Sequence, residues 1–377
     1  MPALRVIVVA EQLLEAEPGS IGLYVRALMR RLPATGVELE PVVAWHRLAV
    51  LSDAGVPYAK RLRRSRSSLY KRWMNGKPPT LGGQAALVHA PSLAFPPRDD
   101  RPLIVTVHDT LFLEDPDAFP PASLAFNRAM VERLADADTV IVPSRTTGNT
   151  LATLGRPPRR IRVVPLGTDM APPTLEERDA ALERLGIERP YVLWTGTLEA
   201  RRNPEGVVRG FVHALEQDIP DAQRLSLYLA GPPGWWSKDI SAFVDSKGLT
   251  GRVRRIDAQP GPVRAALYAG ASAFVFPSLA EGFGLPVIEA MACGAPVVTS
   301  NRSSLPEIAG SAAELCDPSD YESVGDALAK VLRDRGLAED LRRLGFRRAA
   351  EFTWERTARE TLACYREALI GRDVPEY

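Results

Sequence analysis

The stretch AFVFPSLAEGFGLPVIEAMACGAPVVTS, residues 273–300, contains the pattern that decides the fold. Apolar runs at 273–278 and 295–300 predict two buried strands, with a loop and a helix between them. Pro286 falls near the start of that helix, where its missing N–H costs no hydrogen bond. Near-continuous apolar strands joined through a helix are typical of a parallel sheet covered by helices on both faces.

The same pattern recurs along most of the chain. Further strands are expected at 5–10, 39–45, 86–90, 102–108, 138–143, 161–167, 191–196, 225–231 and 252–256. The charged, proline-containing stretch 167–190 interrupts the pattern and predicts a linker with one short helix. We therefore expect an α/β protein with two doubly wound parallel-sheet domains, 1–168 and 169–377, facing a cleft that holds the ligand. The last helix, 354–370, has an apolar face that suits either domain, including a return to the first.

Composition excludes several classes of protein. The formal net charge is +1, with 45% hydrophobic and 25% charged residues, which disfavours a general nucleic-acid binder. Three widely spaced cysteines, Cys293, Cys316 and Cys364, form no disulfide framework or metal knuckle and predict buried, reduced thiols. The apolar run before Glu11 is too short for a signal peptide, and no run is long enough to span a membrane. We expect a cytoplasmic protein, either free in the cytoplasm or bound peripherally at the inner face of the cytoplasmic membrane.

The loop inside the opening stretch has residues that a plain connection does not need. Gly282 and Gly284 let a ligand approach the backbone, and the helix start that follows suits a phosphate. The carboxylate of Glu281 would repel a bound phosphate, so its presence in the loop needs another explanation. A sugar next to the phosphate supplies one, because the carboxylate can accept hydrogen bonds from its hydroxyl groups. Glu289, expected in the first turn of the helix, either binds hydroxyls too or only complements the helix dipole.

A second candidate loop, TGTLEARRNPEG, follows the strand at 191–196. Gly196 allows a tight turn, and the guanidinium groups of Arg201 and Arg202 suit bidentate binding of phosphate. The alternative is a pair of solvated arginines at a helix start. Their position at the carboxyl end of a strand favours binding.

Two histidines end expected strands of the first domain. His108, followed by Asp109, and His89 occupy equivalent positions toward the cleft, although a lone histidine is more often a structural group at a core edge. Gly19 and Gly22 form a glycine loop after the first strand. Their spacing is not the G-x-G-x-x-G fingerprint, so a dinucleotide site is unsupported.

The stretch KRLRRSRSSLYKRWMNGK, residues 60–77, has eight Lys or Arg and no acid. It is interpreted either as a solvated mobile loop or as a patch for anionic lipid head groups or a diphosphate-linked acceptor. In the second case Tyr70 and Trp73 would be the interfacial anchors. RNA is a third possibility, which the near-neutral remainder of the chain argues against.

Together these stretches resemble glycosyltransferase family 4, the retaining nucleotide-sugar enzymes with the GT-B fold. The E-x7-E motif of the family is present as Glu281 and Glu289, and the resemblance covers most of the chain. It implies a catalytic set of Glu281, His108, Arg201 and Arg202. The other donor-side residues that it implies are Gly22, Gly196, Thr197, Gly231, Gly282, Phe283, Gly284, Leu285 and Glu289, and those on the acceptor side are His89, Asp109 and Gly19.

By this resemblance Glu281 would contact hydroxyls of the donor sugar and Glu289 the ribose. Arg201 and Arg202 would hold the diphosphate, and His108 would lie beside the transferred sugar. The implied reaction is transfer of a hexosyl group to a saccharide or lipid-linked acceptor in polysaccharide biosynthesis, without a metal or a cofactor. The expected donor is GDP-mannose, from which a mannosyl group is transferred.

The sequence departs from the family pattern at several positions. Thr197 stands where many relatives have Arg, and Arg202 where they have Lys. The run 257–262 does not identify the nucleotide base. Alternatives on the same fold are a nucleotide-sugar hydrolase or epimerase, for which no acid/base cluster is found, and a non-catalytic sugar-nucleotide-binding protein.

Overall fold

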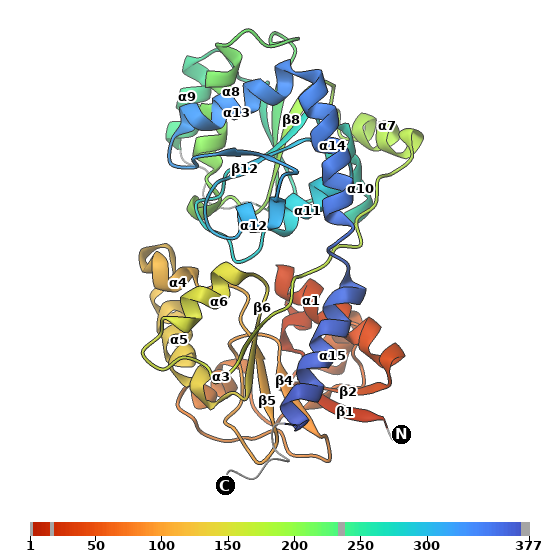
Figure 1. The fold of residues 1–377 in the computed structure, drawn as a ribbon, viewed down its shortest axis with the longest axis vertical. Helices are drawn as coiled ribbons and strands as arrows, with labels where there is room; N and C mark the ends of the chain where they lie inside the picture. Colours follow the sequence, from red (N-terminus) through yellow and green to blue (C-terminus); the bar gives the residue numbers. More distant parts are fainter. Residues whose placement is uncertain (1–2, 16–18, 233–237, 371–377) are drawn as a thin grey trace. The chain divides into compact units, whose positions relative to one another are not determined.

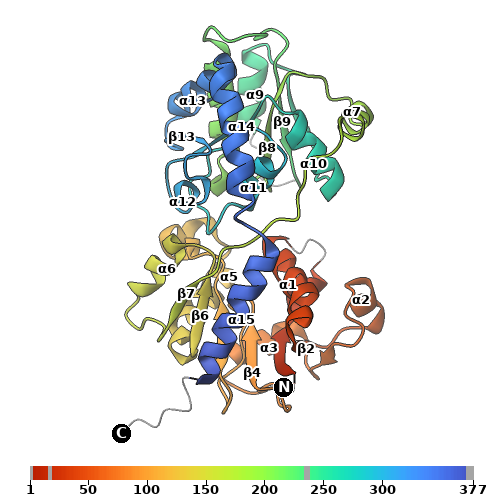
Figure 2. The ribbon, with the colours of Figure 1, turned by 45° about the vertical axis from the view of Figure 1, so that its right-hand side comes forward.

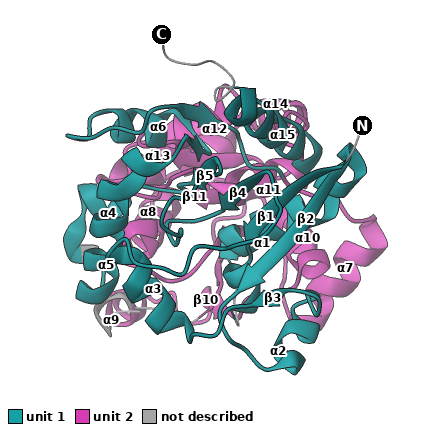
Figure 3. Cartoon of the chain, turned by 90° about the horizontal axis from the view of Figure 1, so that it is seen from below, with its two compact units in different colours: residues 1–167, 354–377 teal, residues 168–353 magenta. Residues whose placement is uncertain are grey.

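The structure is a computed structural model that describes residues 3–15, 19–232 and 238–370. The chain forms two compact units (Figure 3). One comprises Met1–Gly167 and Trp354–Tyr377, and the other comprises Thr168–Thr353. Each unit is built on one sheet in which every described strand pair is parallel, with helices on both faces (Figures 1 and 2). The expected architecture of two doubly wound parallel-sheet domains is confirmed.

The first unit has a seven-stranded sheet in the order β3-β2-β1-β4-β5-β6-β7. Its strands are β1 Leu4–Val9, β2 Val37–Val43, β3 Lys60–Arg61, β4 Leu87–Ala90, β5 Leu103–Thr106, β6 Thr139–Val142 and β7 Ile161–Val163. Its α-helices are α1 Gly19–Arg31, α2 Leu48–Asp53, α3 Arg66–Met74, α4 Leu111–Glu114, α5 Pro121–Glu132, α6 Arg145–Ala152 and α15 Trp354–Ile370. Short 3-10 helices lie at Glu11–Leu14, Leu32–Thr35, Pro116–Ala118 and Arg133–Asp136.

The second unit has a six-stranded sheet in the order β10-β9-β8-β11-β12-β13. Its strands are β8 Tyr191–Thr195, β9 Ser226–Ala230, β10 Val253–Ile256, β11 Ala273–Phe276, β12 Val297–Ser300 and β13 Glu314–Cys316. Its helices are α7 Leu175–Arg184, α8 Pro204–Leu215, α9 Lys238–Ser246, α10 Gly261–Gly270, α11 Leu285–Ala292, α12 Leu305–Ala309, α13 Tyr321–Arg333 and α14 Arg335–Ala349, with a 3-10 turn at Ala200–Arg202.

Every strand expected from an apolar run is present, with ends shifted by a few residues. The sequence did not predict β3 and β13, which are edge strands of two and three residues. The stretch 167–190 is also not a simple linker. Thr174 caps α7 through a capping box with Glu177, and α7 packs against α10 inside the second unit.

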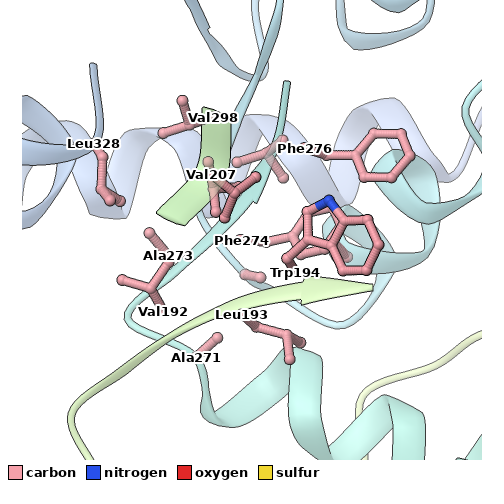
Figure 4. Close-up of a cluster of buried hydrophobic side chains, with 14 of the residues drawn as sticks. Val192, Leu193, Trp194, Val207, Ala271, Ala273, Phe274, Phe276, Val298 and Leu328 are labelled. Atoms are coloured by element: carbon pink, nitrogen blue, oxygen red, sulfur yellow. The ribbon is translucent and has the colours of Figure 1, made fainter. Parts of the chain in front are cut away.

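The second unit has a buried aromatic core around its two central strands. Trp194 of β8 and Phe274 and Phe276 of β11 are fully buried, and the two phenylalanine rings stack with centroids 5.8 Å apart (Figure 4). Val207 of α8 packs in the same cluster. This core holds β8 and β11 as neighbours, and the strand order reverses between them. Ligands of doubly wound sheets bind at the carboxyl ends of such strands.

The C-terminal helix α15 packs in the first unit, against α1. The Thr357 hydroxyl donates to the Pro165 carbonyl at 2.7 Å, and the Tyr365 hydroxyl lies 2.8 Å from Nδ1 of His89. The other ring nitrogen of His89 lies 2.8 Å from the Thr106 hydroxyl. His89 is therefore a fully buried structural group. Its expected contact with an acceptor is wrong, because protein partners occupy both ring nitrogens.

Acid should destabilise the fold through His89. Burial, with a smaller effect of His108, lowers the pKa of His89 from 6.5 to about 3. Between these values the unfolded chain binds more protons than the folded one, so stability is lost as the pH falls from about 6.5 toward 3. Urea unfolding across this range should show that dependence, and His89→Gln should reduce its slope. The control Gln84→Asn changes an exposed side chain that does not titrate and should retain the slope. Equal slopes in all three proteins would contradict the assignment.

The close approach of β8 and β9 at their carboxyl ends should make Gly231 irreplaceable. A Cβ at Gly231 would lie 1.7 Å from the carbonyl oxygen of Gly196, so the backbone would have to move. Gly231→Ala should cost about 3 kcal/mol or more of unfolding free energy. The control Gly261→Ala adds a methyl group where nothing lies within 4 Å. Chemical denaturation should separate the two variants, and equal midpoints would refute the close contact.

Candidate functional site

The loop after β8 holds two arginines in a fixed turn. Arg201 and Arg202 end the 3-10 turn, and Asn203 follows in the left-handed region with φ 56°. The side chain of Asn203 accepts from the Gly206 N–H at 3.0 Å, which caps α8, and donates to the carbonyls of Pro277 and Pro318. Asn203 therefore fixes the arginine turn to the start of α8 and to the loop after β11.

Glu281, in the loop after β11, lies between these two arginines. One carboxylate oxygen lies 3.4 Å from Nη1 of Arg201 and the other 3.5 Å from Nε of Arg202. The Glu281 side chain is only 12% exposed. A second carboxylate, Glu199, accepts from Nε of Arg201 at 2.9 Å. The structure thus brings together three of the residues that the sequence indicated as one site.

Two serines that no sequence motif indicated hold the backbone of the Glu281 loop. The Ser303 hydroxyl accepts from the Glu281 N–H at 3.1 Å and lies 2.7 Å from its carbonyl. The buried Ser304 hydroxyl lies 2.7 Å from the Glu281 carbonyl and 3.0 Å from that of Phe283. Gly284 starts α11 at φ 104°, where a Cβ would meet Leu305 at 2.5 Å. Both serines follow β12, so the only signal in the sequence was their position after a strand.

Glu289 is placed differently from the expectation. It is the fifth residue of α11 and lies beyond the first turn, so its role as a dipole partner is wrong. Its carboxylate accepts from Nη2 of Arg264 at 3.1 Å and from the Tyr268 hydroxyl at 3.3 Å. Burial raises its pKa, against the opposing effect of Arg264. Tyr268 also bonds Thr195 at 2.8 Å, which links this cluster to the end of β8.

The remaining donor-side residues surround the same loops. Gly196 and Thr197 follow β8, Gly231 follows β9, and Gly282, Phe283 and Leu285 flank the start of α11. Phe283 is buried and meets the ring of Phe352 edge-on. The site of the second unit is therefore assembled from the loops after β8, β9, β11 and β12.

His108 of the first unit lines a cavity of about 300 Å³. Its Nε2–H donates to the Pro91 carbonyl at 3.0 Å, and Nδ1 has no partner among the described residues. The ring packs edge-on against Tyr24, with centroids 5.0 Å apart. Burial lowers the pKa of His108 to about 4, so the ring is neutral near pH 7. A neutral ring with a lone-pair nitrogen accepts a hydrogen bond and donates none at that atom.

The same cavity has an aromatic wall and a mixed polar rim. Tyr70 stacks on Phe126 at 5.5 Å. The polar groups along the wall include Gln12, Ser92, Asp109, Asn127 and an ion pair between Arg66 and Glu15. Aromatic faces with hydrogen-bonding groups around them are suited to a sugar ring.

Several other expectations about the first unit are wrong. Gly19 and Gly22 lie inside α1 instead of in a glycine loop, and residues 16–18 of that segment lie outside the described residues. The stretch 60–77 contains the helix α3, so it is not a mobile loop. Trp73 is 1% exposed and donates to the Pro79 carbonyl, which excludes it as an interfacial anchor.

The cysteines and the lengths of the helices were the subject of two further expectations. Cys293, Cys316 and Cys364 are all buried and free, as expected. In the part of the chain that the structure describes, no helix is both long and apolar enough to cross a membrane.

Comparison with known proteins identifies the family. Residues 177–348 match the model of glycosyl transferases group 1, and residues 21–171 match that of glycosyltransferase family 4. O-antigen chain mannosyltransferase B of Escherichia coli is 30% identical over 74% of this chain and 74% of its own. A D-inositol 3-phosphate glycosyltransferase of Catenulispora acidiphila is 29% identical over 77% of this chain and 71% of its own.

Solved structures show the same fold. Sucrose-phosphate synthase of Thermosynechococcus elongatus has a TM-score of 0.73 and 22% identity, covering 97% of this chain and 99% of that one. HepE of Anabaena, in complex with UDP and glucose, has a TM-score of 0.73 and 15% identity, covering 97% and 100%. With its two Rossmann-like units and the matches to both family models, the chain belongs to glycosyltransferase family 4 and is a glycosyltransferase of the GT-B fold.

Proposed function

We propose that this glycosyltransferase moves a mannosyl group from GDP-mannose to a saccharide or lipid-linked acceptor, with retention of configuration and without a divalent metal. The observation that supports a nucleotide-sugar donor is the convergence of Glu281, Arg201 and Arg202 at the end of the central strands. Two guanidinium groups match a diphosphate, and a carboxylate beside them matches sugar hydroxyls. The mannosyl part rests on the similarity to the Escherichia coli mannosyltransferase.

In the proposed reaction the acceptor oxygen attacks the anomeric carbon on the face that the diphosphate leaves. The bond from that carbon to the phosphate oxygen breaks, and the leaving phosphate takes the proton of the acceptor. Arg201 and Arg202 stabilise the charge that develops on the diphosphate, which is the electrostatic role that a metal ion has in other transferases. In the cavity of the first unit, Nδ1 of His108 accepts a hydrogen bond from a sugar hydroxyl.

The acceptor we propose is a neutral saccharide, presented free or on a lipid carrier at the inner face of the cytoplasmic membrane. Relatives named for D-inositol 3-phosphate suggest a phosphorylated polyol instead. The cavity beside His108 argues against a phosphate, because Glu15 and Asp109 lie along it and Arg66 is already paired with Glu15. An anion placed there would meet the carboxylate of Asp109 and an ion pair that has no net charge.

A thermal-shift screen tests the donor. GDP and GDP-mannose should raise the unfolding midpoint more than UDP, ADP or their sugars, because a ligand that binds only the folded state stabilises it by mass action. Transfer to a mannose-terminated oligosaccharide should survive EDTA, and nuclear magnetic resonance of the product should show an α-linkage. A larger shift with UDP-glucose would reject the proposed donor, and loss of transfer in EDTA would reject metal independence.

The ion pairs of Glu281 lead to a sharper test of the site. Without a donor, Glu281 and Glu199 neutralise the two arginines. A diphosphate must displace Glu281 from them, and the freed carboxylate then accepts from sugar hydroxyls. Glu281→Gln should therefore abolish transfer while free nucleoside diphosphate binds about tenfold more tightly, or ~1.4 kcal/mol.

Calorimetric titration with the diphosphate that the screen selects would measure this effect. The matched control Glu205→Gln removes a carboxylate that pairs with Arg209 on the same helix start, and it should change neither affinity nor transfer. Weaker diphosphate binding in Glu281→Gln would show that the carboxylate contacts the nucleotide part directly. Binding of no nucleotide to the unchanged protein would reject the proposed function itself.

A further inference from the structure

The first unit has a corner where large apolar side chains are exposed. Trp45, which follows β2, is 56% exposed, and Leu48, at the start of α2, is 57% exposed. Val50 of the same helix is 37% exposed. α2 lies at the periphery of its unit, beside the sheet edge formed by β3 (Figures 2 and 3). Exposed residues of this size gathered on one short segment indicate a binding surface.

Backbone contacts place basic residues at the same corner. The Trp45 N–H donates to the Arg64 carbonyl at 2.7 Å, and the Arg61 guanidinium donates to the His46 carbonyl at 3.3 Å. The parallel pairing of β2 with β3 brings Val43 opposite Arg61, so the residues that follow each strand leave the sheet side by side. We call the following exposed residues the Trp45 surface: Trp45, Arg47, Leu48, Val50, Arg63 and Arg64.

Positive charge is concentrated here in a chain that is nearly neutral overall. Residues 45–64 contain five Lys or Arg and one acid, Asp53, at the far end of α2, whereas the whole chain has a net charge of +1. Arg66 is left out of this count because Glu15 pairs with it. The pairing of β2 with β3 places these residues at one corner of the unit. The buried Trp73 is not part of this surface.

We propose that the Trp45 surface docks the protein on an anionic lipid bilayer. Tryptophan beside arginine is suited to the headgroup region, where the ring is half in apolar surroundings and the guanidinium binds lipid phosphate. Leu48 and Val50 enter the acyl boundary, and neither gains anything from a nucleic-acid backbone. Charge and apolar area together are the two signals that reversible membrane binding requires. The docking does not depend on which sugar is transferred.

Co-sedimentation with vesicles tests this proposal. The protein should bind vesicles of phosphatidylcholine with 30 mol% phosphatidylglycerol and not those of phosphatidylcholine alone. The double variant Arg63→Glu with Arg64→Glu should reduce partitioning about tenfold or more. The double variant Trp45→Ser with Leu48→Ser should reduce the binding that persists in 0.5 M salt, where electrostatic attraction is screened.

The matched control is Arg156→Glu with Arg159→Glu. These exposed arginines lie between α6 and β7, at the opposite edge of the same sheet, and their replacement gives the same change in net charge. The control should bind vesicles as the unchanged protein does. Equal loss in both charge variants, no vesicle binding by the unchanged protein, or binding of an RNA oligonucleotide in place of vesicles would each overturn the proposal. All of these side chains are exposed, so unfolding midpoints should be unchanged and would reveal any misfolded variant.

Discussion

The placement of Glu281 between Arg201 and Arg202 is the constraint on which the site of the second unit depends. A carboxylate that is only 12% exposed is costly unless cations compensate it. β8 and β11 are neighbours in the sheet, so the loops at their carboxyl ends meet and supply both partners. Asn203 on one loop and Ser303 on the other then fix the backbones, so that the charges stay about 3.5 Å apart.

The two glutamates of the E-x7-E motif are both held by side chains from other elements of the second unit. Glu281 is paired with arginines from the loop after the neighbouring strand β8, and Glu289 with Arg264 and Tyr268 of α10. In each case a largely buried carboxylate is paired with side chains from another loop or helix of the same unit. Each carboxylate already has protein partners, so a ligand that uses it has to compete with them.

Much of this arrangement could be predicted from the sequence, because buried parallel strands are continuous apolar runs and their carboxyl ends share one edge. That rule was enough to bring Glu281, Arg201 and Arg202 together. It failed at Lys60–Arg61, a charged edge strand too short to show a pattern. It failed at His89 as well, since its partner Tyr365 lies 276 residues away and only the tertiary fold brings them together.

The contrast between Trp73 and Trp45 shows the same limit on surfaces. In the sequence Trp73 stands among lysines and arginines and looks like an anchor, yet α3 turns it into the core, where its N–H meets the Pro79 carbonyl. Trp45 follows a buried strand and looks like part of it, yet the chain leaves the sheet after Val43 and the ring is left in solvent. Charge runs are visible in a sequence, whereas the apolar residues exposed beside them depend on where strands end. A basic stretch therefore identifies a region, and the fold determines which of its side chains can meet a partner.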